Sequence, residues 1–160
     1  MAIITRRTFM QAAGAAATLP VLGNKAFAAD KVKIGFIFLG PVGDYGWTWA
    51  HNKGREQVEK ELGDKVETVY VENVQEDASA IPVIRDLAQQ GCKLIFTTSY
   101  GYMDQTIAVA KEFPNVKFEH CTGYKRADNV ATYNSKFHEG RAVLGTIAGK
   151  MSKSGTLGHL

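Results

Sequence analysis

The sequence predicts an α/β fold in which helices cover both faces of a mostly parallel sheet. From residue 31 onward, short apolar runs rich in β-branched and aromatic residues alternate with longer segments of helical periodicity. The apolar runs are typical of buried strands, and the longer segments are typical of amphipathic helices. Strands that are separated by helices need crossover connections, and these connections produce a parallel sheet.

The first strand, helix and second strand follow from their patterns. Residues 31–39, "KVKIGFIFL", form a continuous apolar run that predicts a buried strand. Residues 49–63, "WAHNKGREQVEKELG", predict a helix that ends where Gly63 follows its last periodic residue. Residues 65–73, "KVETVYVEN", alternate in part and predict a second strand.

The remaining elements continue the alternation. They are a helix over 77–91, a strand over 93–99, a helix over 102–114, strands over 116–122 and 130–134, a helix over 135–151 and a final strand in "SGTLGHL". In the first of these helices, Asp77 or Ser79 can cap the N-terminus, and Pro82 is tolerated if it lies in the first turn.

We expect the strands to adopt the flavodoxin-like order 2-1-3-4-5, because the first crossover must reverse direction before the sheet can grow the other way. In such a sheet the ligand crevice lies beyond the carboxyl ends of the strands, at the switch point between strands 1 and 3. The loops that would meet there are 40–47 after the first strand, 99–104 after the third and 120–129 after the fourth.

These loops are rich in aromatic and polar residues. Their aromatic residues are Tyr45, Trp47, Trp49, Tyr100, Tyr102 and Tyr124. We expect Trp47 to be a platform on which a flat ligand stacks, and we expect Trp49 to pack between helix and sheet. Asp44 can accept hydrogen bonds from ligand N–H groups, and the glycines of "GPVGDYG" are expected to allow a tight turn with positive φ. Further polar groups at this edge come from Ser99, Tyr102 and Asp104.

Other chemistries fit the sequence less well. Glycines at 40, 43 and 46 are spaced G-x-x-G-x-x-G, which matches neither the dinucleotide pattern nor a phosphate-binding P-loop. His120 and Cys121 are neighbours on a strand and would point to opposite faces, so they are not a catalytic dyad. His51 has no acidic partner on its helix face and is expected to be solvent-exposed. We expect no catalytic residue, metal or cofactor.

The two cysteines are expected to be free thiols. Cys92 precedes the third strand and Cys121 ends the fourth. In a parallel pair they would lie roughly 15 Å apart at about 3.3 Å per residue. A disulfide needs Cα atoms within about 7 Å of each other.

The first 28 residues have the layout of an export signal. The segment 5–10, "TRRTFM", carries paired arginines, an alanine-rich run continues to Leu22, and "AFA" at 26–28 offers a signal-peptidase site. The Arg6-Arg7 pair resembles the twin-arginine type, and we expect cleavage after Ala28. The mature protein would then be periplasmic.

The positive charge of the chain belongs to this leader. The whole chain has 19 Lys and Arg against 16 Asp and Glu. The leader holds Arg6, Arg7 and Lys25 and no acidic residue, so the remainder has 16 of each sign. A neutral mature chain gives no indication of nucleic-acid binding. The last predicted strand has no visible partner, and we expect the chain to be part of a longer protein.

Three stretches together resemble one known family. They are "KIGFIFLGPVGDYGWTWAHNKG", "LIFTTSYGYMDQTIAVAKEFPNVKFEHCTGY" and "ATYNSKFHEGRAVLGTIAGKMSKSG", in order within residues 31–160. They are similar to the basic membrane protein family, the PnrA-like substrate-binding proteins of ABC importers. The resemblance implies a type I periplasmic binding fold, in which two α/β lobes joined by a hinge close on a purine nucleoside or base. It implies a first lobe over 29–132 and the truncated start of a second lobe over 133–160.

The resemblance also implies ligand contacts. Asp44 takes the place of the family's acidic residue after the first strand, and Trp47 takes the place of a stacking phenylalanine. The predicted contacts are Asp44, Trp47, Ser99, Tyr100, Gly101, Tyr102, Asp104, Thr122, Asn134 and Phe137. The family often has an acidic residue after the fourth strand, where this chain has "HCTGYK". This variant looks closer to members that bind a free base such as adenine.

Two functions from different classes follow. The first is a periplasmic receptor that closes on a purine base or nucleoside by a hinge motion and docks on an ABC permease in the inner membrane. The alternative is a nucleoside-processing enzyme of the hydrolase or phosphoribosyl type on a similar sheet. A receptor returns its ligand unchanged, whereas an enzyme releases free base or sugar.

Export is expected to depend on both arginines of the leader. Replacing Arg6 and Arg7 with lysine should reduce the amount of mature protein in the periplasm, because the twin-arginine route reads this pair. Immunoblots of periplasmic fractions measure the difference. Undiminished export of the variant would contradict the twin-arginine assignment in favour of a general secretory route.

Overall fold

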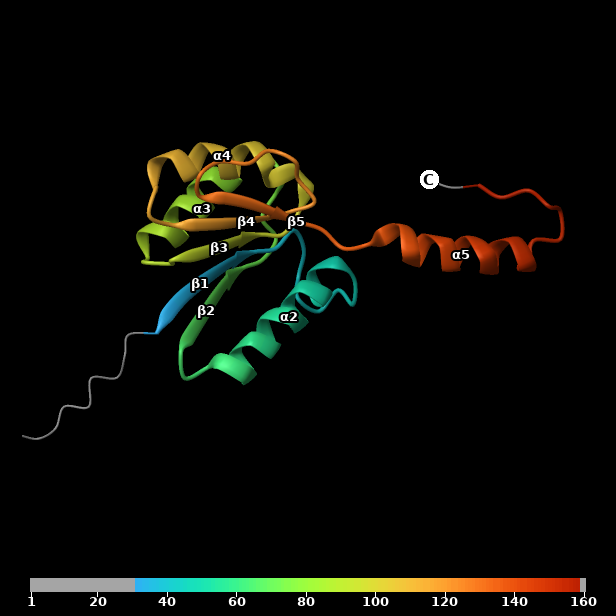
Figure 1. Cartoon of the computed structure of the whole chain (residues 1–160), viewed down its shortest axis with the longest axis horizontal. Helices are drawn as coiled ribbons and strands as arrows, with labels where there is room; N and C mark the ends of the chain where they lie inside the picture. The colour runs from blue at the N-terminus through green and yellow to red at the C-terminus, as the bar shows by residue number, and fades with distance from the viewer. Residues whose placement is uncertain (1–30, 159–160) are drawn as a thin grey trace, which may run out of the picture. The chain divides into compact units, whose positions relative to one another are not determined.

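The computed structural model describes residues 31–158, so the expected export signal over 1–28 lies outside the described residues. Figure 1 shows the elements along the chain. They are β1 (Val32–Ile37), α2 (Trp47–Leu62), β2 (Val66–Val71), α3 (Ala80–Gln89), β3 (Leu94–Thr97), the 3₁₀ turn η1 (Tyr100–Tyr102), α4 (Met103–Glu112), β4 (Lys117–Cys121), β5 (Val130–Tyr133) and α5 (Phe137–Met151). The expected final strand is not seen, since residues 152–158 contain no strand.

The sheet has five strands in the order β2-β1-β3-β4-β5, and all four neighbouring pairs are parallel. The predicted strand order is therefore confirmed. In the middle of β1, Gly35 pairs with Val69 of β2 on one side and with Ile95 of β3 on the other. Because every strand runs the same way, the loops that follow the strands leave from one edge of the sheet.

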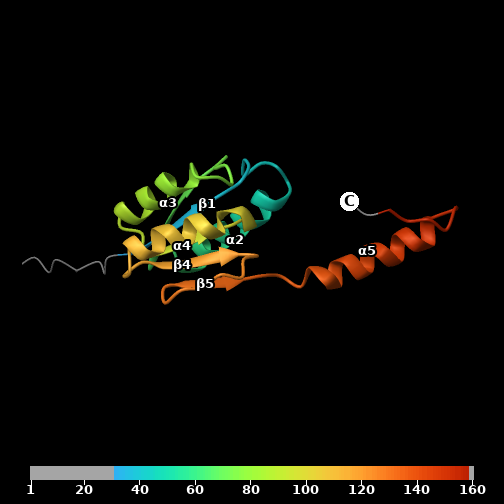
Figure 2. The ribbon, with the colours of Figure 1, turned by 90° about the horizontal axis from the view of Figure 1, so that it is seen from above.

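One face of the sheet is covered by α3 and α4, which lie together in Figures 1 and 2. The main hydrophobic core lies under these helices, and its most buried side chains include Ile84, Leu87, Ile95, Val109 and Phe118. Gly35 allows α3 to approach β1 closely, because a Cβ there would lie 3.2 Å from Cδ1 of Leu87. Burial of this apolar surface is the main stabilising contribution to the lobe.

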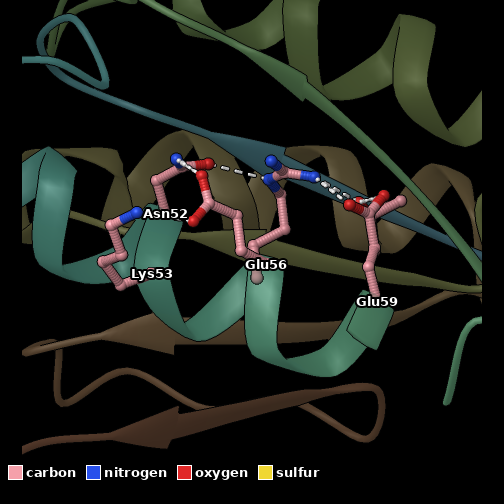
Figure 3. Close-up of polar contacts among 6 residues, drawn as sticks. Asn52, Lys53, Glu56 and Glu59 are labelled. Carbon is pink, nitrogen blue, oxygen red and sulfur yellow. Dashed lines mark hydrogen bonds and ion pairs between the residues drawn. The ribbon is translucent and has the colours of Figure 1, made fainter. Parts of the chain in front are cut away.

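The helix α2 lies on the opposite face and is held by polar contacts instead of an apolar stripe (Figure 1). Its buried residues are Thr48, Asn52 and Arg55. The Arg55 guanidinium donates to Oδ1 of Asn52 (2.8 Å) and to Oγ1 of Thr68 on β2 (2.8 Å). It also pairs with the carboxylate of Glu59 (2.9 Å). Figure 3 shows the polar contacts along α2, including the hydrogen bond that the Asn52 amide donates to Glu56 (2.9 Å).

A smaller apolar cluster lies on the α2 side of the sheet. Phe36 stacks on Phe96 with ring centroids 4.8 Å apart, and Tyr133 meets Phe96 edge-on. Between these strands and α2 runs a groove of about 450 Å³. Near the carboxyl edge it shares Ala50, His51 and Tyr133 with the pocket described in the next section.

The expectation that Trp49 packs between helix and sheet is wrong. Its indole is only half-buried, lies against the ring of Tyr45 (centroids 5.9 Å apart) and is covered by the ammonium of Lys53 (5.8 Å). The physical reason is helical geometry. With 3.6 residues per turn, position 49 lies about 100° around the helix from position 48, so it is on the flank of α2 and not at the centre of the face that positions 48, 52 and 55 turn to the sheet.

The predicted free thiols are confirmed, since Cys92 and Cys121 are both unpaired and buried.

The last helix, α5, buries none of its residues. Its most exposed apolar side chains are Val143, Leu144, Ile147 and Met151. Within residues 31–158, no helix combines the length and the apolar character that crossing a membrane requires.

Removing the Arg55 side chain should weaken the attachment of α2. We expect Arg55→Ala to lower the free energy of unfolding by about 2–3 kcal/mol, because hydrogen bonds to a charged group contribute roughly 1.5–3 kcal/mol and their partners would be left unpaired. Urea denaturation measures the change. The control is Lys53→Ala on the exposed side of the same helix, which should stay within about 0.5 kcal/mol of the parent. Equal losses in both variants would contradict the polar attachment.

Candidate ligand-binding site

The N-terminus of α2 is tied to the end of β3 by the side chain of Trp47. The indole N–H donates to the carbonyl oxygen of Thr98 (2.7 Å), and the Thr98 hydroxyl donates to the carbonyl oxygen of Ile37 at the end of β1 (2.7 Å). These bonds hold the half-buried indole at the switch point between β1 and β3. Trp47 therefore lies at the edge that the sequence predicted, and its contact with a ligand stays a prediction.

An open pocket of about 460 Å³ lies beside this indole. It is lined by Gly46, Trp47, Ala50, His51, Cys121, Tyr133, Asn134, Ser135 and Phe137. The indole centroid lies 4.9 Å from that of the His51 imidazole and 5.8 Å from that of the Phe137 ring. Three predicted contacts, Trp47, Asn134 and Phe137, are thus brought together in a pocket whose wall is mainly aromatic.

His51 and Tyr133 are the ring-bearing pocket residues that were not predicted as contacts. The expectation that His51 is solvent-exposed is wrong, because its ring is half-buried between Trp47 and Tyr133 and its Nδ1 lies 2.9 Å from the Trp47 carbonyl oxygen. Tyr133 pairs in register with Cys121, and burial raises its pKa. The spacing of Trp47 and His51, one helical turn apart, was the available signal that both share a face.

Asp44 caps α2. Its carboxylate accepts backbone N–H bonds from Gly46 (2.7 Å), Trp49 (2.9 Å) and Thr48 (3.3 Å). The bond from Gly46 has the largest effect in lowering the pKa of this carboxyl, so it is ionised at neutral pH, as suits a helix N-terminus. Oδ1 accepts two of these bonds and Oδ2 accepts one, so Oδ2 is the atom with more capacity left to accept a bond from a ligand.

The expectation that glycines provide the positive φ of this loop is wrong. The residue with positive φ is Tyr45 (52°).

Tyr102 belongs to the core, which corrects its prediction as a ligand contact. The side chain is 0% exposed, and its hydroxyl donates to the carbonyl oxygen of Val74 (2.5 Å). Burial raises the pKa of this phenol, so it stays protonated. The residue anchors η1 to the loop after β2, and no part of its ring faces the pocket.

The other predicted contacts also lie outside this pocket. Tyr100 is 54% exposed, and Ser99 before it is half-buried. The exposed Asp104 forms an ion pair with Lys125. Thr122 has a φ of 64°, and its hydroxyl donates to the carbonyl oxygen of Cys121 (2.6 Å). The N–H of Gly101 donates to Oε1 of Glu76 (2.7 Å). Their roles as ligand contacts stay predictions.

A buried polar cluster lies beneath these loops. The His120 imidazole is 1% exposed, and its Nδ1 lies 2.9 Å from Oγ1 of Thr97, which also accepts a bond from the Thr106 hydroxyl (3.0 Å). Nε2 is buried and has no partner within residues 31–158. Burial lowers the pKa of His120, and the backbones of Thr97 and Tyr100 oppose this to a smaller extent. The imidazole is therefore held in its neutral form.

Comparison with known proteins identifies relatives of this chain. The sequence profile described as ABC transporter substrate-binding protein PnrA-like matches residues 31–160. A purine-binding protein of Brucella abortus (strain 2308) is 56% identical over 140 residues, which are 88% of this chain and 40% of that protein. A Haloferax volcanii protein that is named for glucose binding in an ABC transporter is 34% identical over 138 residues, which are 86% of this chain and 35% of that protein.

A solved solute-binding protein of an ABC transporter system from Aeropyrum pernix K1 shares the fold. It superposes with a TM-score of 0.64 at 24% identity, over 73% of this chain and 32% of that chain. The chain thus spans about 40% of the length of the Brucella relative and about 35% of the Haloferax relative.

The buried His120 should make the stability of the lobe depend on pH. Its pKa is lowered in the folded state, so between that value and the ordinary 6.5 the unfolded chain binds more protons, and stability rises with pH. We expect the free energy of unfolding to increase from pH 5 to pH 7.5, as measured by urea denaturation. His120→Gln should show a smaller increase, whereas the control His138→Gln on α5 should keep it. An unchanged increase in His120→Gln would contradict this role.

Proposed function

The chain belongs to the PnrA-like family of ABC transporter substrate-binding proteins, and we propose that it is the ligand-binding part of a receptor for a purine base or nucleoside. The observation that carries the proposal is the position of Trp47 beside an aromatic pocket at the switch point of the sheet. The 56% identity to a relative named for purine binding supports the same ligand class.

The pocket suits a flat, hydrogen-bonding ligand. The Trp47 ring is fixed by its bond to Thr98, and a fixed aromatic ring can stack on a planar base without losing further side-chain freedom. Polar groups of Asn134 and Ser135 lie at the rim. Mainly apolar walls with a few polar groups are typical of small-molecule sites.

The rest of the proposed mechanism concerns closure and delivery. We propose that residues 133–160 begin a second lobe, that the ligand is held between the two lobes, and that a hinge motion closes them. The closed receptor would then dock on an inner-membrane ABC permease. Removal of the leader near Ala28 would release it into the periplasm. The exposed apolar side chains of α5 are consistent with an element that packs against further chain.

A receptor is favoured over a nucleoside-processing enzyme. The family and the Brucella and Haloferax relatives are named for binding. Incubation with adenosine followed by chromatography separates the two functions, because a receptor returns adenosine intact and an enzyme releases adenine.

Trp47→Ala in the full-length gene product should weaken adenine binding by about ten- to a hundredfold, because stacking of a base on an aromatic side chain contributes roughly 1–3 kcal/mol. Isothermal titration calorimetry measures the affinity. Trp49→Ala is the matched control, since this second tryptophan of α2 does not line the pocket and should leave affinity unchanged. Glucose serves as the competing ligand class suggested by the Haloferax relative. Tight glucose binding with no adenine binding would overturn the purine assignment.

A further inference from the structure

The pocket wall contains a polar atom whose role is set by the fold, Nε2 of His51. The side chain lies one turn after Trp47 and folds back along α2, so that Nδ1 lies 2.9 Å from the Trp47 carbonyl oxygen. A carbonyl oxygen only accepts hydrogen bonds, so Nδ1 must carry the hydrogen. In the neutral imidazole, Nε2 is then left with a lone pair and acts as an acceptor.

This acceptor is available to a ligand. His51 lines the pocket, with its ring centroid 4.9 Å from that of Trp47 and 6.4 Å from that of Tyr133. Within residues 31–158, Nε2 makes no hydrogen bond, and it is not among the buried polar atoms that lack a partner. Nε2 is therefore not fully enclosed, although the His51 ring that lines the pocket is half-buried.

Some neighbouring polar groups of the wall already have partners within the chain or lie at the exposed rim. The Trp47 N–H donates to Thr98, and Tyr133 lies beside Cys121 on the neighbouring strand. Oδ1 of Asn134 accepts the N–H of Ser135 (2.9 Å) and lies in the exposed rim. A hydrogen bond to His51 would form between aromatic rings, where water competes less than at the rim, so it discriminates more strongly between ligands.

We propose that His51 determines ligand specificity by accepting a hydrogen bond from a ring N–H of the ligand, and that the pocket therefore selects a free purine base over its nucleoside. This inference rests on the proposed function. A free base carries a hydrogen on its imidazole ring, whereas the same ring of a nucleoside carries the sugar. A site built to pair with a ligand N–H rejects the analogue without it, because its own acceptor is then left unpaired.

The experiment compares adenine, 9-methyladenine and adenosine by calorimetry on the full-length gene product. The parent should bind adenine about ten- to a hundredfold more tightly than 9-methyladenine, as expected for the loss of one partially buried hydrogen bond. His51→Phe keeps an aromatic ring and removes the acceptor, so its preference should fall to within about twofold. His51→Gln retains an acceptor oxygen at a similar reach and should restore part of the preference.

The outcomes separate this inference from the proposed function. Absence of adenine binding in the parent would overturn the proposed function and this inference with it. Adenine binding with equal affinity for 9-methyladenine would overturn the inference alone. Undiminished discrimination by His51→Phe would also overturn it, because the preference would then arise from exclusion of the methyl group by shape and not from the lone pair of His51.

Discussion

The hydrogen bond from the Trp47 indole to the Thr98 carbonyl oxygen is the contact on which the candidate site depends. It joins the first turn of α2 to the end of β3, and Thr98 in turn bonds to Ile37 at the end of β1. His51 packs on the same indole and bonds to the carbonyl of Trp47 itself. A displacement of Trp47 would therefore move both the indole and the imidazole of the pocket wall.

The orientation of α2 is set by polar contacts, and this has a consequence for the pocket. Apolar surfaces tolerate some sliding and rotation, whereas hydrogen bonds require defined distances and angles. The bond from Arg55 to Thr68 on β2 restricts the rotation of the helix about its axis, and Asn52 holds the guanidinium in place for it. That rotation decides which residues of α2 face the pocket, so a cluster two turns away from Trp47 helps to define the binding surface. Directional contacts of this kind add specificity more than stability.

The sequence predicted the strand order and the edge at which the loops meet, because buried strands and amphipathic helices have strong periodic patterns. It did not predict which side chains would be buried at that edge. The position of Trp49 was predicted wrongly because the buried face of α2 is polar and carries no apolar pattern that would mark it. Tyr102 is buried because its hydroxyl reaches Val74, a contact between distant segments that local patterns do not contain. The spacing of His51 from Trp47 placed both on one helix face, but the contact of His51 with Tyr133 on the last strand, which half-buries its ring, is not contained in local patterns.

The loops of the carboxyl edge are held to one another independently of any ligand. Asp44 accepts N–H bonds from the start of α2, Glu72 accepts one from Val42 (2.5 Å), and Glu76 accepts one from Gly101 (2.7 Å). Glycine is required at 101, because a Cβ there would lie 2.5 Å from that of Glu76. Under the proposed function, a ligand would have little of these loops to order on binding, which would reduce the entropic cost of association. Since α5 buries no residue, the closure that we propose would use the short connection between β5 and α5 and not the loops of the carboxyl edge.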